Sequence, residues 1–287
     1  MEWTSEFFAE NVCNLLTKSA VRTIQCSFSS SSWSSAAAWA IEKRSCYTVV
    51  FPNEHEKRLH DDLKTDPSSR VTSLVFDIQH ESAELEQELG EFLRFMAYDD
   101  DSEIDFKVPA LVRSRKTAKM TVTKAMNLIE SPRFRPSCFF TKIRNLQRVC
   151  FASVSFLQRH IKRGILKEVS LMQGWSCKDI CWIQDLLPQK QLIKFNSLPS
   201  IGVTFELHIL NKILATIAAE RPPEGNTRIY EFRASFGHRL QSVMETAGFL
   251  TKRNYQSNSC FFSCKNICVN VYHDGKSTFQ LFATYLT

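Results

Sequence analysis

The sequence predicts an α/β protein in which a small N-terminal helical module precedes irregular βα units and a C-terminal β-hairpin. Three observations support this class. Apolar residues recur at helical spacing over residues 6–46, strand and helix signals alternate from about residue 149 onward, and residues from 260 onward have the pattern of hairpin strands. Alternation of strands and helices is typical of a mainly parallel sheet with helices packed on it. We therefore expect a helical module at 1–46 and an α/β domain at 47–287.

The first 46 residues are expected to form short helices joined by polar breaks. Several large apolar residues fall near one helical face: Phe7, Phe8, Val12, Leu15 and Leu16. A run with six serines between Ser29 and Ser35 interrupts this pattern, and serine favours caps and turns. The run 36–41 then resumes a helix that ends near Lys43-Arg44.

Between residues 46 and 130 the pattern predicts three strands and two helices. The expected strands are Cys46–Phe51, Val71–Ile78 and Ile104–Val108, and the expected helices are 81–98 and 116–130. The first strand is β-branched and aromatic and is stopped by Pro52-Asn53. The helix 81–98 carries an apolar stripe among glutamates.

From residue 149 onward strands and helices alternate. The expected strands are Val149–Phe151, Leu166–Met172, Leu192–Leu198 and Ile229–Ala234, with hairpin strands Cys260–Cys264, Ile267–Tyr272 and Thr278–Leu286. The expected helices are 153–163, 176–187, 204–220 and 237–247. Gly164 and Gly248 are natural helix ends, and Asp274-Gly275 favours a tight hairpin turn.

The spacing of two strands is loosely that of a leucine-rich repeat. The strands at Leu166 and Leu192 start about 26 residues apart with a helix between them, and leucine-rich repeats have periods in this range. Because no repeated asparagine or leucine frame is evident, the prediction stops at irregular βα units.

Composition indicates a folded chain without a membrane span. The chain has 287 residues, 44% of them hydrophobic and 22 of them Phe, so it can bury a sizeable core. Neither a secretory signal nor a run of about 20 mainly apolar residues is visible. Ten cysteines in such a chain are expected to be reduced thiols, which favours a cytoplasmic or nuclear location.

Charge is unevenly placed along the chain. Residues 81–105 hold ten acids and one base, whereas residues 107–164 hold fourteen Lys or Arg and one acid. One interpretation is two solvated faces that partly neutralise each other. The other is a basic surface for an acidic partner, and Phe134, Phe139 and Phe140 are interleaved there as base-stacking candidates. Nucleic-acid binding through 107–164 is therefore the alternative function.

No catalytic, cofactor or metal motif is recognisable, so we expect a non-enzymatic protein without a cofactor. Phosphate-loop, nucleophile-elbow and zinc-protease motifs are missing from the sequence. Cys177 with Cys181, and Cys260, Cys264 and Cys268, have spacings that zinc permits, but their apolar settings favour packing. The run Asp99–Asp101 is expected in a solvated loop, because adjacent carboxylates do not converge on one ion.

The N-terminal residues also carry a family resemblance. Its carriers are Glu6-Phe7-Phe8, Val12, Leu15-Leu16, Val21, Ile24, the serine-flanked Trp33, a helix through Arg44 and the strand Tyr47–Phe51. Together these resemble a divergent F-box of the large nematode-expanded family of F-box-like proteins. The helix 156–164, the strand Leu166–Leu171 and Gly174-Trp175 are similar to the α/β bodies of the same family.

This resemblance implies a substrate adaptor in the ubiquitin-conjugation pathway. An F-box is three short helices whose apolar face packs on the Skp-type adaptor of a cullin–RING ubiquitin ligase, while the rest of the chain holds a protein substrate. The residues that would contact the adaptor are Phe7, Phe8, Val12, Leu15, Leu16, Val21 and Trp33.

The cysteine interpretation gives the first testable prediction. Thiol titration of the unfolded chain is expected to find all ten cysteines free, and the purified protein is expected to carry no stoichiometric zinc by atomic emission. One tightly bound zinc per chain that disappears in the Cys260→Ala variant would contradict the prediction.

Overall fold

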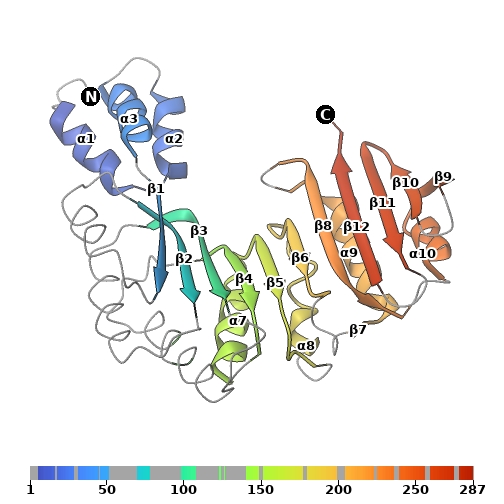
Figure 1. The fold of residues 1–287 in the computed structure, drawn as a ribbon. Coiled ribbons are helices and arrows are strands. Elements are labelled where there is room, and N and C mark those ends of the chain that lie inside the picture. Colours follow the sequence, from blue (N-terminus) through green and yellow to red (C-terminus); the bar gives the residue numbers. More distant parts are fainter. Residues whose placement is uncertain are drawn as a thin grey trace. The chain divides into compact units, whose positions relative to one another are not determined.

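The computed structural model divides the chain into two compact units, Met1–Thr141 and Lys142–Thr287, which are described separately (Figure 1). The predicted boundary after residue 46 lies inside the first unit. The structure describes residues 6–16, 18–28, 32–44, 46–51, 70–77, 98–107, 123, 126, 140–148, 151–176, 180–198, 204–222, 225–235, 239–255, 259–274 and 278–286.

The first unit begins with the predicted helical module, which is confirmed. Its helices are α1 (Glu6–Leu15), α2 (Lys18–Ser27) and α3 (Ser32–Lys43). α3 begins within the serine run, consistent with the preference of serine for helix starts. The break between α2 and α3 falls at the serine run, where the sequence predicts it, whereas the break between α1 and α2 was not located from the sequence.

Three parallel strands follow the helices in the first unit. They are β1 (Cys46–Phe51), β2 (Arg70–Asp77) and β3 (Tyr98–Lys107), in the order β1-β2-β3. Leu74, Val75 and Phe76 are consecutive buried residues, as expected for a central parallel strand that is covered on both faces. Phe76 pairs with Phe106 on β3, and the two rings stack with centroids 5.5 Å apart.

The acidic run Asp99–Asp101 lies in β3 and not in the predicted loop, so that prediction was wrong. The register explains the error. Val71 pairs with Tyr98 and Ser73 pairs with Glu103, so the acids between these partners fall out of register with β2. The predicted helix 81–98 lies outside the described residues except at Tyr98, and of the predicted helix 116–130 the structure describes only Thr123 and Met126, both helical.

The second unit contains a mixed sheet. Its strands are β4 (Lys142–Leu146), β5 (Glu168–Leu171), β6 (Lys194–Asn196), β7 (Thr204–Phe205), β8 (Thr227–Ala234), β9 (Leu250–Tyr255), β10 (Ser259–Cys264), β11 (Ile267–His273) and β12 (Thr278–Tyr285). The order is β4-β5-β6-β8-β12-β11-β10-β9, with β7 also pairing with β8. The pairs from β4 to β8 are parallel, and the pairs from β8 to β9 are antiparallel.

A 26-residue repeat sets the parallel part of this sheet. Ile143 pairs with Val169, which pairs with Phe195, and all three are buried. The residues three positions earlier, Phe140, Leu166 and Leu192, are buried as well. Each 26-residue repeat thus contributes the same two core positions, and successive repeats stack on one another as they do in repeat proteins. The loosely leucine-rich-repeat-like α/β class is confirmed, and the repeat includes β4, which the sequence pattern missed.

Helices α7 (Phe151–Arg163), α8 (Ile180–Ile183), α9 (Leu207–Ala219) and α10 (Leu240–Thr246) accompany the sheet. In Figure 1, α7, α8 and α9 lie behind the strands, on one side of the sheet. α9 buries an apolar stripe: Ile209, Leu210, Ile213, Leu214 and Ile217. The hydroxyl of Tyr285 on β12 donates to the carbonyl of Ile217 at 3.1 Å, which ties α9 to this face. The opposite face carries the alternate, more exposed side chains.

Three element predictions in the second unit need correction. Phe151 begins α7 instead of ending a strand, because the helical spacing of the following residues extends back to it. The predicted helix 176–187 is reduced to α8 and a series of turns, in which Leu186 N–H donates to the Ile183 carbonyl three residues back. The strand β9 was not predicted, since its centre is polar, as is common for edge strands.

The Gly174-Trp175 pair joins the ends of β4 and β5. The Trp175 ring is buried, and its Nε1–H donates to the Leu146 carbonyl at 2.9 Å. Gly174 has φ of +94°, and a Cβ there would lie 3.1 Å from the Arg148 carbonyl oxygen. A side chain at 174 would therefore be both strained and crowded, so glycine is required for Trp175 to reach its place.

Arg228 places a fully buried guanidinium beside the sheet. Its Nη1 donates to the carbonyl of Leu192 at 3.2 Å, and its Nη2 donates to the carbonyl of Lys190 at 2.7 Å and more weakly to that of Glu220 at 3.4 Å. Glu220 is the residue that follows α9. One side chain on β8 therefore holds both the loop before β6 and the carboxyl end of α9, where a cation is favoured.

We predict that Arg228→Met destabilises the protein strongly. Several buried carbonyls would lose their donor, and each unsatisfied polar group is costly, so the free energy of unfolding should fall by about 3 kcal/mol or more. Urea denaturation followed by circular dichroism measures the change. The exposed Arg239→Met is the matched control and should leave stability nearly unchanged. Equal stability of the two variants would contradict this role for Arg228.

His160 on α7 is a buried, neutral histidine. Its Nδ1 lies 3.0 Å from the Phe156 carbonyl oxygen, so the proton belongs on Nδ1, and its Nε2 has no partner within the described residues. Burial lowers the pKa of His160 to about 4, and the neighbouring cations Arg163 and Arg159 add to the effect. Protonation is therefore disfavoured in the folded state.

This pKa predicts loss of stability in mild acid. Between the ordinary value of 6.5 and about 4, the unfolded chain binds a proton that the folded chain does not, so stability falls as pH decreases through this window. The total loss from this group is about 3 kcal/mol. His160→Leu should flatten the decline in the free energy of unfolding between pH 6.5 and 4, whereas the exposed His208→Leu should not. An unchanged slope in His160→Leu would contradict the assignment.

Candidate functional site

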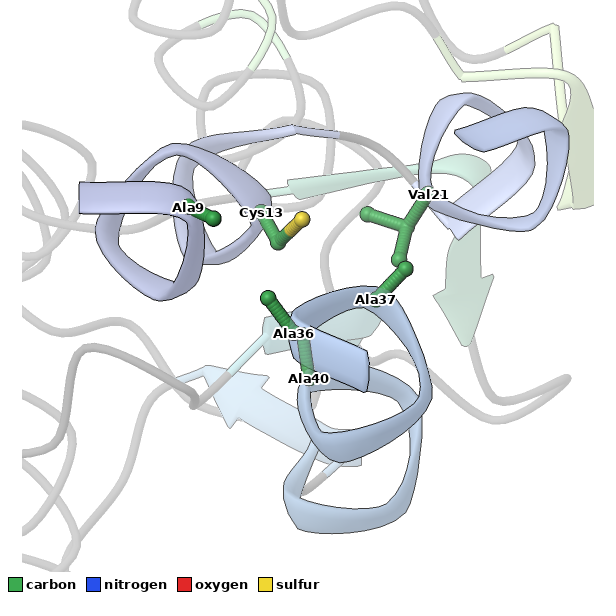
Figure 2. Packing of buried hydrophobic residues seen from close by; sticks show 6 residues of the cluster. All are labelled: Ala9, Cys13, Val21, Ala36, Ala37 and Ala40. Atoms are coloured by element: carbon green, nitrogen blue, oxygen red, sulfur yellow. The ribbon is translucent and has the colours of Figure 1, made fainter. Parts of the chain in front are cut away.

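The helical module packs around very small side chains. Ala9 and Cys13 of α1, Val21 of α2, and Ala36, Ala37 and Ala40 of α3 form its buried core and point toward one another (Figure 2). Leu16, Ile24, Trp33 and Ile41 pack partly buried against this core. Because alanines let helices approach closely, little internal volume is left for aromatic rings, which lie at the rim of the module.

Arg44 closes the module at the carboxyl end of α1. Its Nη2 donates to the carbonyl of Leu16 at 2.9 Å and to that of Cys13 at 3.4 Å. These carbonyls lie in and just after the last turn of α1, where a cation interacts favourably with the negative end of the helix dipole. The basic residue after α3 thus fixes α1 against α3, and burial raises the pKa of the nearby Cys13 thiol.

The structure divides the predicted adaptor-binding residues into a surface group and a core group. Phe8 is 54% exposed, and its ring packs edge-on against Trp33 of α3 with centroids 6.2 Å apart. Val12, one turn after Phe8, is half-buried on α1. Leu16 lies partly in the core, and Val21 is fully buried in it. The side chains of Phe7 and Leu15 lie outside the described part of the chain.

We call Phe8, Val12 and Trp33 the rim patch. It joins an exposed aromatic ring of α1 to a partly buried tryptophan of α3, so α1 and α3 share one apolar surface. The sequence pattern grouped all large apolar residues of α1 together and did not separate rim from core. Helical phase provides the missing signal, because Ala9 and Cys13 form the buried stripe next to the one that carries Phe8 and Val12.

Two exposed aromatic residues of the module were not singled out from the sequence. Trp39 of α3 is 38% exposed, and Phe28, just after α2, is 44% exposed. The run Ala36–Ile41 is almost wholly apolar, so hydrophobicity alone hides the orientation of Trp39. Burial of Ala36, Ala37 and Ala40 on one side of α3 leaves Trp39 on the other, away from the rim patch.

Within the described residues no group of three or more metal-ligating side chains converges. Cys264 pairs with Ile267 across β10 and β11, so Cys268, the next residue, points to the opposite face of the sheet. These two thiols therefore cannot share one ion. Cys177 lies outside the described residues, and Cys181 lies exposed on α8.

The basic stretch 107–164 is only partly described. Its described cations lie on several elements: Lys107 ends β3 in the first unit, and the others lie in the second unit. Lys142 and Arg144 lie on β4, whereas Arg159, Lys162 and Arg163 lie on α7. This portion of the stretch does not form one continuous basic surface, and nucleic-acid binding through it stays a prediction.

No protein-family model matches the sequence, and no curated protein or solved structure is significantly similar to the chain. In the part of the chain that the structure describes, no helix combines the length and apolar character needed to cross a membrane.

Proposed function

We propose that the chain is a non-enzymatic interaction protein, an F-box-like adaptor that presents a protein substrate to a cullin–RING ubiquitin ligase. In this proposal the helical module binds a Skp-type adaptor protein, and the α/β units hold the substrate. The chemistry is positioning, because the ligase partners supply catalysis. The observation that carries the proposal is the rim patch, an apolar surface shared by two helices of a three-helix module.

The exposure of Phe8 is the strongest part of this argument. A large aromatic side chain that is 54% exposed gains little from the fold of the monomer, and more than half of the Phe8 surface stays open to a partner while its ring packs edge-on against Trp33. A partner that covers both rings would bury aromatic surface at the centre of an interface, where binding energy concentrates. The arrangement suits helix-to-helix docking better than catalysis, since the rim patch contains no titratable group.

The core residues of the module have a different role in this proposal. Val21 and most of Leu16 support the shape of the module and do not meet a partner directly. Arg44 has the same supporting role, because its hydrogen bonds hold α1 in place beside α3. Contact residues and supporting residues can therefore be separated by experiment.

We expect Phe8→Ala to weaken binding of a purified Skp-type adaptor by about 2 kcal/mol, roughly thirtyfold, without loss of helical content. Phe28→Ala is the matched control, because it removes an equally large, exposed ring that follows α2 and is not one of the rim-patch residues. Isothermal titration calorimetry measures affinity, and circular dichroism checks the fold. Affinity should change little with salt, because the patch is apolar.

Failure of the unmodified chain to bind the adaptor would overturn the proposal. So would equal losses in Phe8→Ala and Phe28→Ala. Val21→Ala provides a further check, since it should lower thermal stability through a core cavity while leaving the exposed rings unchanged.

A further inference from the structure

The face of the parallel strands opposite α7 carries two rows of polar side chains. In the first row Lys142, Glu168 and Lys194 are register partners across β4, β5 and β6. In the second row Ser170 pairs with Asn196, and Arg144 lies beside them on β4. The 26-residue repeat therefore aligns charges on this face as regularly as it aligns core residues on the other.

A β-bulge shapes this surface into a pocket. Between their paired positions, β4 advances from Ile143 to Leu146 while β5 advances from Val169 to Leu171, so β4 contains one extra residue. Asn145 takes up the extra length with φ of 52°, a conformation that asparagine tolerates. The pocket has a volume of about 230 Å³, and its polar lining is Arg144, Asn145, Glu168, Ser170, Lys194 and Asn196.

The pocket holds more hydrogen-bond donors than acceptors. Glu168, its single carboxylate, already pairs with Arg144 at 3.3 Å and with Lys142 at 3.9 Å. The exposed ammonium of Lys194 makes no ion pair within the described residues. The Asn196 side-chain oxygen accepts from the backbone N–H of Leu198 at 3.0 Å, which leaves the amide N–H groups of Asn196 to donate. The donors need an oxygen-bearing, negatively charged ligand.

We propose that this pocket binds an acidic segment of a partner protein, which deepens the proposed function by naming the chemical class of its substrate. Strands lie about 4.8 Å apart, and Arg144 is two strands away from Lys194 and two residues further along, so their backbones are roughly 12 Å apart. A segment in the polyproline II conformation has three residues per turn and rises about 3.1 Å per residue, so side chains three positions apart lie on one face about 9 Å apart. The long side chains of Arg144 and Lys194 can reach over the remaining distance. Carboxylates three positions apart meet the two cations, and an uncharged residue between them faces Glu168.

Several features favour a peptide over a nucleic acid at this site. None of the pocket-lining residues is aromatic, so the pocket provides no surface on which bases stack. A nucleic-acid backbone would also bring a phosphate at every nucleotide, including the position that faces Glu168. A peptide can place a hydroxyl there and donate to the carboxylate.

The test uses the full chain and a fluorescein-labelled peptide of about twelve residues with glutamate at every third position and serine between. Fluorescence anisotropy should show binding that Lys194→Gln weakens roughly tenfold. The matched control is Lys212→Gln, an exposed lysine on α9 without an ion pair in the described structure, which should stay within about twofold of the unmodified chain. Both variants lose the same charge.

Glu168→Gln gives a prediction of opposite sign. It removes the negative charge between the cations, so peptide binding should strengthen, whereas mere disruption of the pocket would weaken it. Three results overturn the proposal: no peptide binding by the unmodified chain, equal loss in the two lysine variants, or weaker binding in Glu168→Gln. A single-stranded RNA that outcompetes the peptide through Lys194 would also overturn it, in favour of a nucleic-acid surface.

Adaptor binding is measured on the same variants, so that the two proposals fail separately. Lys194→Gln should bind the Skp-type adaptor as the unmodified chain does, and Phe8→Ala should bind the acidic peptide normally. Peptide binding without adaptor binding would leave the pocket established and remove the ligase function. Adaptor binding without peptide binding would support the ligase function and overturn the proposed peptide pocket.

Discussion

The second unit depends on one buried cation. Arg228 is fully buried, and its two terminal guanidinium nitrogens donate to backbone carbonyls from the loop before β6 and from the end of α9. Its position on β8 is also where the sheet changes from parallel to antiparallel pairing. The same region is tied externally by the ion pair of Lys190 with Glu220, whose backbone carbonyl Arg228 contacts. A charge that is costly to bury thus fixes the junction between the repeat-like strands and the C-terminal hairpins.

Helices cover one face of the sheet, so the same repeat places apolar residues in the core and charged residues on the opposite face. Along β5 and β6, Val169 and Phe195 point toward the helices, while Glu168 and Lys194 point away. Since side chains alternate along a strand, a register that stacks apolar residues on one face must also stack the intervening residues on the other. The alignment of side chains in these rows therefore follows from the register of the core. Only the identity of the aligned residues can be selected for binding.

Local patterns in the sequence predict most elements of this fold but not the features that depend on distant partners. The helices of the module, β1 and the hairpin strands follow from spacing and turn residues. β4 was missed because two consecutive polar residues, Arg144 and Asn145, break the alternation at the bulge, so the strand becomes recognisable only beside β5. The run Asp99–Asp101 was predicted as a loop because its sequence carries no strand pattern. It belongs to β3 through the pairing of that strand with β2. In the candidate site, the hydrophobic pattern placed Val21 with Phe8, although Val21 is buried and Phe8 is exposed, since burial depends on which helix faces which.

The small core of the helical module bears on its function. A three-helix unit with alanine at most buried positions gains little free energy from its own interior, because each alanine removes little apolar area from water. Larger residues in that core would remove more apolar area from water and would hold the unit together more strongly. Instead the hydrogen bonds of Arg44 stabilise the packing of α1, and the aromatic rings stay at the rim. The ring of Phe8 thus stays exposed at the surface of the module, which is the premise of the proposed adaptor contact.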